Sequence, residues 1–141
     1  MEENKQKVIA YIDGFNFYYG LRQYPWKKYY WLDTVKLIES FLHPNQELIA
    51  VKYFSARPTD VDKRKRQDAF LHNCDAAIII SADSDMIPAI ELAKEAKVRV
   101  YIYFPPNQFS SNLATMGSGM PLHMRRYEKK FKNSLLPDKM V

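Results

Sequence analysis

Acidic side chains come directly after two apolar stretches of the sequence. Residues 8–12 are followed by Asp13, and residues 76–80 are followed, after two small residues, by Asp83 and Asp85. Short apolar runs rich in β-branched residues are typical of buried strands. Open α/β sheets place their functional sites at the carboxyl ends of such strands. If the two strands are parallel neighbours, the three carboxylates meet at one edge of the sheet.

Three clustered carboxylates repel one another unless a cation or protons compensate their charge. Hard oxygen ligands of this kind suit Mg²⁺ or Mn²⁺, so we expect Asp13, Asp83 and Asp85 to bind one of these ions. Asn16 can offer an amide to the same site. Alternation along an extended chain would align Ser81 with Asp83 and Asp85 in one row. A bound metal ion could activate water and stabilise the charge that develops on a phosphodiester.

A purely structural interpretation of the same residues stays open. Asp83, Ser84 and Asp85 precede a helical pattern that has Pro88 in its first turn, so they could serve only to cap that helix. Asp13 could serve only to make a turn. This alternative explains one acid in each cluster, but it does not explain why acids gather at two apolar strand ends.

Composition places the chain among soluble globular proteins. The 141 residues are 47% hydrophobic and 26% charged, which fits one domain spanning 1–141. No apolar run approaches the roughly 20 residues that span a bilayer, and residues 1–5 do not resemble a signal peptide. A single cysteine, Cys74, excludes an intramolecular disulfide. We therefore expect a cytoplasmic protein without membrane contacts.

Basic and aromatic residues suggest a nucleic-acid partner, although each has a plainer explanation. The net charge is +5, and basic residues cluster at 63–66, which include Lys63, Arg64 and Arg66, and again at 125–132. Such clusters either track a phosphate backbone or form a solvated helix face. The aromatic residues within 15–19 and 24–31 either stack on bases or close one side of the core.

The order of apolar and amphipathic segments predicts a β-α-β-α-β-α-β chain. This order implies an α/β fold in three layers, with a mostly parallel central sheet and helices on both faces. The near-continuous apolar run at 48–55 suggests a strand covered on both faces.

Several motifs together resemble the NYN domain family, a PIN-like nuclease fold found in LabA-type bacterial proteins. The matching pieces cover nearly the whole chain: Asp13-Gly14-Phe15-Asn16, the basic helix from Lys63 to Asp68, the strand that ends in Ser81-Ala82-Asp83-Ser84-Asp85, and residues 100–113 with Pro105-Pro106-Asn107. The resemblance implies a Mg²⁺- or Mn²⁺-dependent endoribonuclease. Asp13, Asp83 and Asp85 would be its metal ligands, with Asn16 and Ser81 in support and Lys63, Arg64 and Arg66 contacting RNA.

The chain departs from that family between the basic helix and the strand at 76–80. Relatives carry a further strand and a helix there, which bring another acidic residue. Here Leu71 runs almost directly into Asp75, and the chain must return across the sheet. We expect a break or an abnormal connection at 71–75, and an exposed sheet edge that would pair with a second copy in a homodimer.

Two other functions compete with the nuclease hypothesis. Toprim-like and HAD-type phosphatase domains also place acids at strand ends, but they expect a glutamate or an Asp-x-Asp after the first strand, where this chain has Asp13 and Asn16. A catalytically impaired module that binds RNA or protein is the alternative outside the enzymes. Binding that survives EDTA and leaves RNA intact would favour it.

Overall fold

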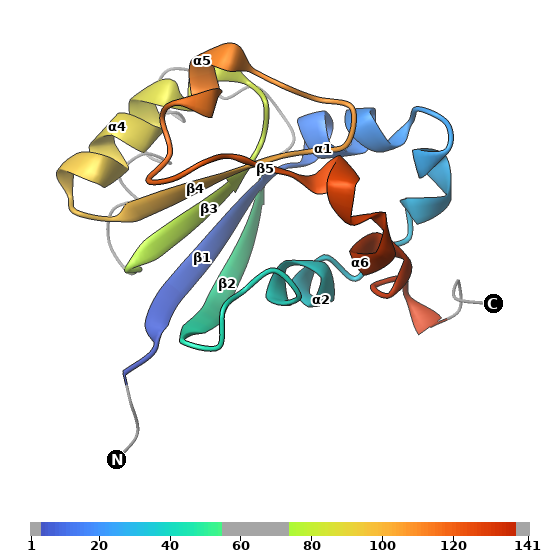
Figure 1. The fold of residues 1–141 in the computed structure, drawn as a ribbon, viewed down its shortest axis with the longest axis horizontal. Coiled ribbons are helices and arrows are strands. Elements are labelled where there is room, and N and C mark those ends of the chain that lie inside the picture. The colour runs from blue at the N-terminus through green and yellow to red at the C-terminus, as the bar shows by residue number, and fades with distance from the viewer. Residues whose placement is uncertain (1–3, 55–73, 138–141) are drawn as a thin grey trace.

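The computed structural model describes residues 4–54 and 74–137. The described residues form a five-stranded parallel sheet with the strand order β2-β1-β3-β4-β5 (Figure 1). Its strands are β1 (Gln6–Asp13), β2 (Gln46–Phe54), β3 (Ala76–Ile80), β4 (Arg99–Phe104) and β5 (Leu122–His123). The predicted α/β fold with a parallel central sheet is therefore confirmed.

Two groups of helices cover the two faces of the sheet. They are α1 (Gly14–Leu21), α2 (Thr34–Glu39), α4 (Ile87–Glu95), α5 (Ser111–Ala114) and α6 (Glu128–Lys132), joined by the 3-10 turns η1 (Trp26–Tyr29), η2 (Ser84–Met86) and η3 (Met124–Tyr127). In Figure 1, α4 and α5 lie on one side of the strands, and α2 and α6 lie on the other. The arrangement therefore has three layers.

Alternation along β1 explains why the molecule has two cores. Val8, Ala10 and Ile12 pack in one core with residues of α1, η1, α2 and α6. Ile9 and Tyr11 pack in the second core with residues of α4 and α5. Because successive side chains of a strand point to opposite faces, an uninterrupted apolar run can supply both cores only when both faces are covered.

The direction of the crossovers reverses between β2 and β3. The β1–β2 connection through α2 moves to one side of β1, whereas β3 pairs with β1 on its other side. Right-handed connections that run in opposite directions place their helices on opposite faces. The basic helix and most of the connection at 71–75, where we expected a break or an abnormal turn, fall within 55–73 and so lie outside the described residues.

The second strand contacts both cores, as predicted, but stays partly exposed. Leu48 and Val51 pack against the first core, and Ala50 packs against the second. In the described part of the sheet, β2 pairs with β1 and occupies one end of the strand order. Its Ile49 and Tyr53 side chains are 41% and 52% exposed. Apolar composition alone did not distinguish this outer strand from a central one, because β-branched and aromatic residues favour both positions.

Candidate metal and phosphodiester site

The carboxyl ends of β1 and β3 lie side by side at the point where the strand order reverses. Ile12 of β1 pairs with Ile80 of β3, so Asp13 and Ser81 follow on adjacent strands. In open α/β sheets, crevices that bind ligands form at such a switch point, because the two connecting chains leave toward opposite faces. The predicted convergence of Asp13 with the end of the strand at 76–80 is thus present in the structure.

Asp13 is a buried carboxylate held by two hydrogen bonds. Its side chain is 7% exposed. Oδ1 accepts from the backbone N–H of Asn16 at 3.0 Å, and Oδ2 accepts from Ser81 Oγ at 3.0 Å. Burial raises the pKa of Asp13 above its ordinary value; the nearby charge of Asp83 raises it further, while the hydrogen bonds from Asn16 and Ser81 lower it. The site therefore contains a carboxylate whose charge is only partly compensated by neutral donors.

Ser81 joins Asp13 to Asp83. Its fully buried hydroxyl donates to Asp13 and accepts from the backbone N–H of Asp83 at 2.9 Å. The chain remains extended at Asp83, whose half-buried side chain accepts at Oδ1 from the N–H of Asp85 at 2.9 Å. One hydroxyl thus fixes the positions of both strand ends relative to each other.

Asn16 ties the start of α1 to the end of β3. Its side-chain Oδ1 accepts from the backbone N–H of Ala82 at 3.0 Å, while its own N–H donates to Asp13. The sequence predicted that Asn16 offers an amide to the site. In the structure, its amide oxygen is used instead to hold the backbone that carries Ser81 and Asp83.

Asp85 does not extend the row of Ser81 and Asp83. The turn η2 begins at Ser84, so the extended alternation that was expected through residue 85 ends at Asp83. Asp85 is exposed. Within residues 4–54 and 74–137, no group of three or more His, Cys, Asp or Glu side chains could hold a metal ion. The described site therefore offers two acidic side chains, Asp13 and Asp83, rather than the expected three.

Both carboxylates also act as helix caps, as the structural interpretation expected. Asp13 caps α1 and Asp83 caps η2. Capping uses one oxygen of each carboxylate, and Ser, Thr or Asn would serve equally well without a charge. It does not account for a buried Asp13 whose second oxygen is held by Ser81. Titratable groups perturbed by burial and by a like charge are typical of functional sites.

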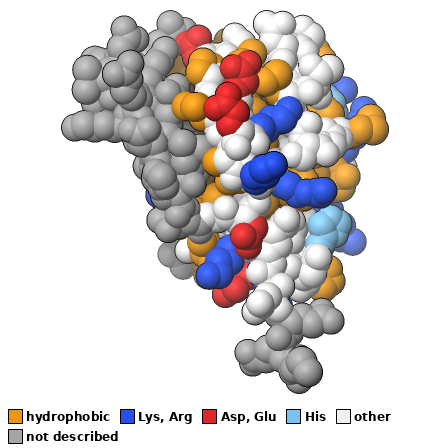
Figure 2. All heavy atoms as spheres, turned by 90° about the vertical axis from the view of Figure 1, so that its left-hand side faces the viewer, with side chains coloured by type: hydrophobic (Ala, Val, Ile, Leu, Met, Phe, Trp, Pro, Cys, Tyr) orange, Lys and Arg blue, Asp and Glu red, His pale blue; other side chains and the backbone are white. Residues whose placement is uncertain are grey.

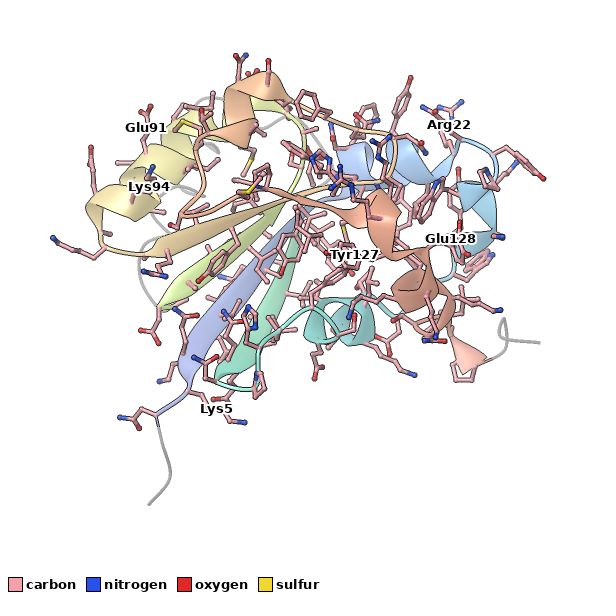
Figure 3. The ribbon with its side chains drawn as sticks, viewed as in Figure 1. Lys5, Arg22, Glu91, Lys94, Tyr127 and Glu128 are labelled. Atoms are coloured by element: carbon pink, nitrogen blue, oxygen red, sulfur yellow. The ribbon has the colours of Figure 1, made fainter. Side chains whose placement is uncertain are left out.

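The opposite edge of the sheet carries an open groove of different character. Lys5, Lys7, Glu47 and Asp75 are among its lining residues, and Figure 3 shows Lys5 at this amino-terminal end of the strands. The face shown in Figure 2 likewise carries both basic and acidic side chains. Mixed charges do not favour one class of ionic ligand, so the groove is a weaker candidate than the carboxyl ends.

Lys63, Arg64 and Arg66 lie outside the described residues, so the structure places no basic side chain from that segment. Their expected contact with RNA stays a prediction. None of the described helices is both long and apolar enough to cross a bilayer.

Comparison with known proteins supports the fold alone. No protein-family model matches the chain, and no curated protein matches it. The structure is similar to the crystal structure of a protein of unknown function, VPA0982, from Vibrio parahaemolyticus RIMD 2210633. The TM-score is 0.58 at 15% sequence identity, and the match covers 86% of this chain and 95% of that one. The architecture of sheet and helices is therefore shared with a natural protein of similar extent.

Proposed function

We propose that this chain is a metal-dependent ribonuclease that cleaves phosphodiester bonds at the carboxyl ends of β1 and β3. One observation carries the proposal: the buried carboxylate of Asp13 is linked through Ser81 to the strand end that bears Asp83, at the switch point of the sheet. The resemblance of the strand-end motifs to the NYN family supports the same activity. We also propose a cytoplasmic location, as the composition predicted.

The donor set fits Mg²⁺ or Mn²⁺ held by few protein ligands. Mg²⁺ commonly binds through one or two carboxylates, keeps several waters, and takes further oxygens from substrate phosphates. Asp13 and Asp83 provide two carboxylates of that kind. Burial raises the pKa of Asp13, so a cation bound beside it would stabilise its ionised form. A bound ion would supply charge neutralisation and Lewis-acid activation at the phosphodiester.

The chain's own residues orient the site. Ser81 fixes the carboxylate of Asp13 through Oδ2, and Asn16 fixes it through Oδ1. Each carboxylate oxygen has a second lone pair for another partner. Preorganised oxygens need little rearrangement when a cation and a phosphate arrive, which is the main contribution a protein makes to such chemistry. We include Lys63, Arg64 and Arg66 in this proposal as groups that contact RNA, and Asp85 as the third carboxylate that the sequence predicted for the catalytic site.

Cleavage of a labelled RNA tests the proposal. Wild-type protein with Mn²⁺ should cut the RNA, whereas EDTA or Asp13→Asn should reduce the rate at least 100-fold, because the anionic ligand is lost. Asp75→Asn is the matched control. Asp75 lies just before β3, at its opposite end, where it accepts a hydrogen bond from the N–H of Lys7 at 2.8 Å, an interaction that an asparagine oxygen can keep. Cleavage that is indifferent to EDTA and to Asp13→Asn would reject the mechanism.

A second function is favoured by the small number of grouped acids. Two acidic side chains are few for a two-metal nuclease, so we also propose a homodimeric module that binds RNA or a protein, with impaired catalysis. RNA binding that persists in EDTA, weakens steeply with salt and leaves the RNA intact would select this function. Light scattering would determine whether the chain dimerises.

A further inference from the structure

Helix α1 presents two aromatic rings to solvent directly after the acidic site. Its buried side is made of Gly14, Phe17, Gly20 and Leu21. Phe15 and Tyr19 lie on the other side, 71% and 48% exposed. Residues four apart share a helix face. The sequence left open whether these aromatic residues close the core or stack on bases. Phe17 closes the core, whereas Phe15 and Tyr19 are exposed and remain free for stacking.

The two exposed rings are ordered against each other. Their centroids lie 6.4 Å apart with an interplanar angle of 18°, so the rings are nearly parallel. The guanidinium of Arg22 lies 5.6 Å from the centroid of the Tyr19 ring, and Figure 3 shows Arg22 at the far end of this helical segment, directed away from the sheet. We call Phe15, Tyr19 and Arg22 the α1 platform: an exposed pair of nearly parallel rings with a positive charge over the ring of Tyr19.

The α1 platform begins beside the candidate site. Phe15 is two residues after Asp13 and immediately precedes Asn16, whose amide oxygen is bonded to the backbone of Ala82. A chain that follows α1 toward the sheet therefore reaches Asp13. The helix is also anchored from the loop that follows β4: Asn107 Nδ2 donates to the carbonyl of Gly20 at 2.9 Å. The rings are thus carried on an element whose position relative to the site is fixed.

We propose that the α1 platform stacks unpaired bases of single-stranded RNA and leads the strand to Asp13. This inference rests on the proposed function and narrows its substrate to single strands. Aromatic rings stack on any base, because every base has a π face, and Arg adds a cation near the phosphate backbone. In a duplex these faces are already stacked on neighbouring bases, so the α1 platform offers a duplex no comparable contact.

Binding measured without cleavage tests the inference. The probe is a fluorescein-labelled 10-nucleotide RNA without secondary structure, in EDTA, alone or annealed to its complement. Fluorescence anisotropy should show that the double variant Phe15→Leu/Tyr19→Leu binds the single strand about tenfold more weakly than wild type. The slope of log Kd against log salt should stay unchanged, because no phosphate contact is removed. Duplex binding should not change.

The matched control keeps both rings. Phe15→Tyr/Tyr19→Phe exchanges the hydroxyl between the two positions, so its affinity should remain within twofold of wild type. Melting temperatures of both double variants should match wild type, because the replaced side chains are exposed.

Equal affinity of wild type and the leucine variant for the single strand would overturn the inference. An equal loss of affinity for the duplex and the single strand in the leucine variant would overturn it as well. So would a wild-type protein that does not bind the single strand. Loss of cleavage in Asp13→Asn tests the acidic site independently, since the binding assay contains no metal ion.

Discussion

Removing the Ser81 hydroxyl should weaken the fold through the charge on Asp13. Ser81→Ala deletes the bond to Asp13 Oδ2 and leaves the N–H of Asp83 without its protein acceptor. Hydrogen bonds to charged groups contribute about 1.5–3 kcal/mol, and Asp83 is exposed enough for water to replace its partner. We therefore expect Ser81→Ala to lower the free energy of unfolding by about 2 kcal/mol at neutral pH, which corresponds to roughly 6 °C in Tm for a chain of this size.

The effect should depend on pH with a definite sign. Burial raises the pKa of Asp13 above the ordinary value of 3.8, so its ionised form opposes folding, and stability falls as the pH rises from that value through the folded pKa. Loss of the Ser81 bond raises the pKa of Asp13 further. The penalty of Ser81→Ala is therefore full at pH values above the folded pKa and becomes smaller as the pH falls below it, where the carboxyl is neutral in both proteins.

Urea unfolding at pH 7 and near pH 4 measures both effects. Ser84→Ala is the matched control, because Ser84 is an exposed serine three residues away, and we expect it to change stability by less than about 0.5 kcal/mol. Ser81→Ala should also cost less in an Asp13→Asn background, which carries no charge at this position. Equal penalties for the two serine variants, or an unchanged Ser81→Ala penalty in that background, would refute the reasoning.

Two further substitutions test how α1 is held in place. Gly20→Ala would place a Cβ 2.1 Å from the carbonyl oxygen of Pro106, a backbone atom that cannot rotate away, so we expect a loss of about 2 kcal/mol in a urea titration; an unchanged midpoint would show that the loop yields freely. Asn16→Ala removes the acceptor for the N–H of Ala82 and should cost about 1–2 kcal/mol. It should also weaken Mn²⁺ binding, because it frees the backbone that carries Ser81 and Asp83. Mn²⁺ affinity equal to wild type, measured by electron paramagnetic resonance, would contradict that role for Asn16.

Much of the fold could be predicted because its signals are local. The apolar runs ending at Asp13 and at Ile80 each form a strand, and helices follow where polar and apolar positions alternate with helical spacing. The two strand ends were expected to meet because the carboxyl ends of neighbouring parallel strands lie at the same edge of a sheet. The partial exposure of β2 was not predicted, because the composition of a strand does not specify which strands and helices will lie next to it.

The details of the site depended on interactions that spacing does not reveal. Alternation predicted a row through Asp85, but the chain turns into a 3-10 helix at Ser84, and local capping by Asp83 overrides the extended pattern. The hydroxyl bridge of Ser81 arises from the pairing of Ile12 with Ile80, two residues far apart in sequence. The sequence identified Ser81 and Asn16 as polar groups near the acids, whereas their partners required coordinates.

Anomalous diffraction from crystals soaked in Mn²⁺ tests the central proposal most directly. The account predicts a strong peak bonded to carboxylate oxygens of both Asp13 and Asp83, and the loss of that peak in crystals of Asp13→Asn. Crystals of the wild-type protein that show no peak between these two side chains at saturating Mn²⁺, or a peak that survives in Asp13→Asn, would contradict it.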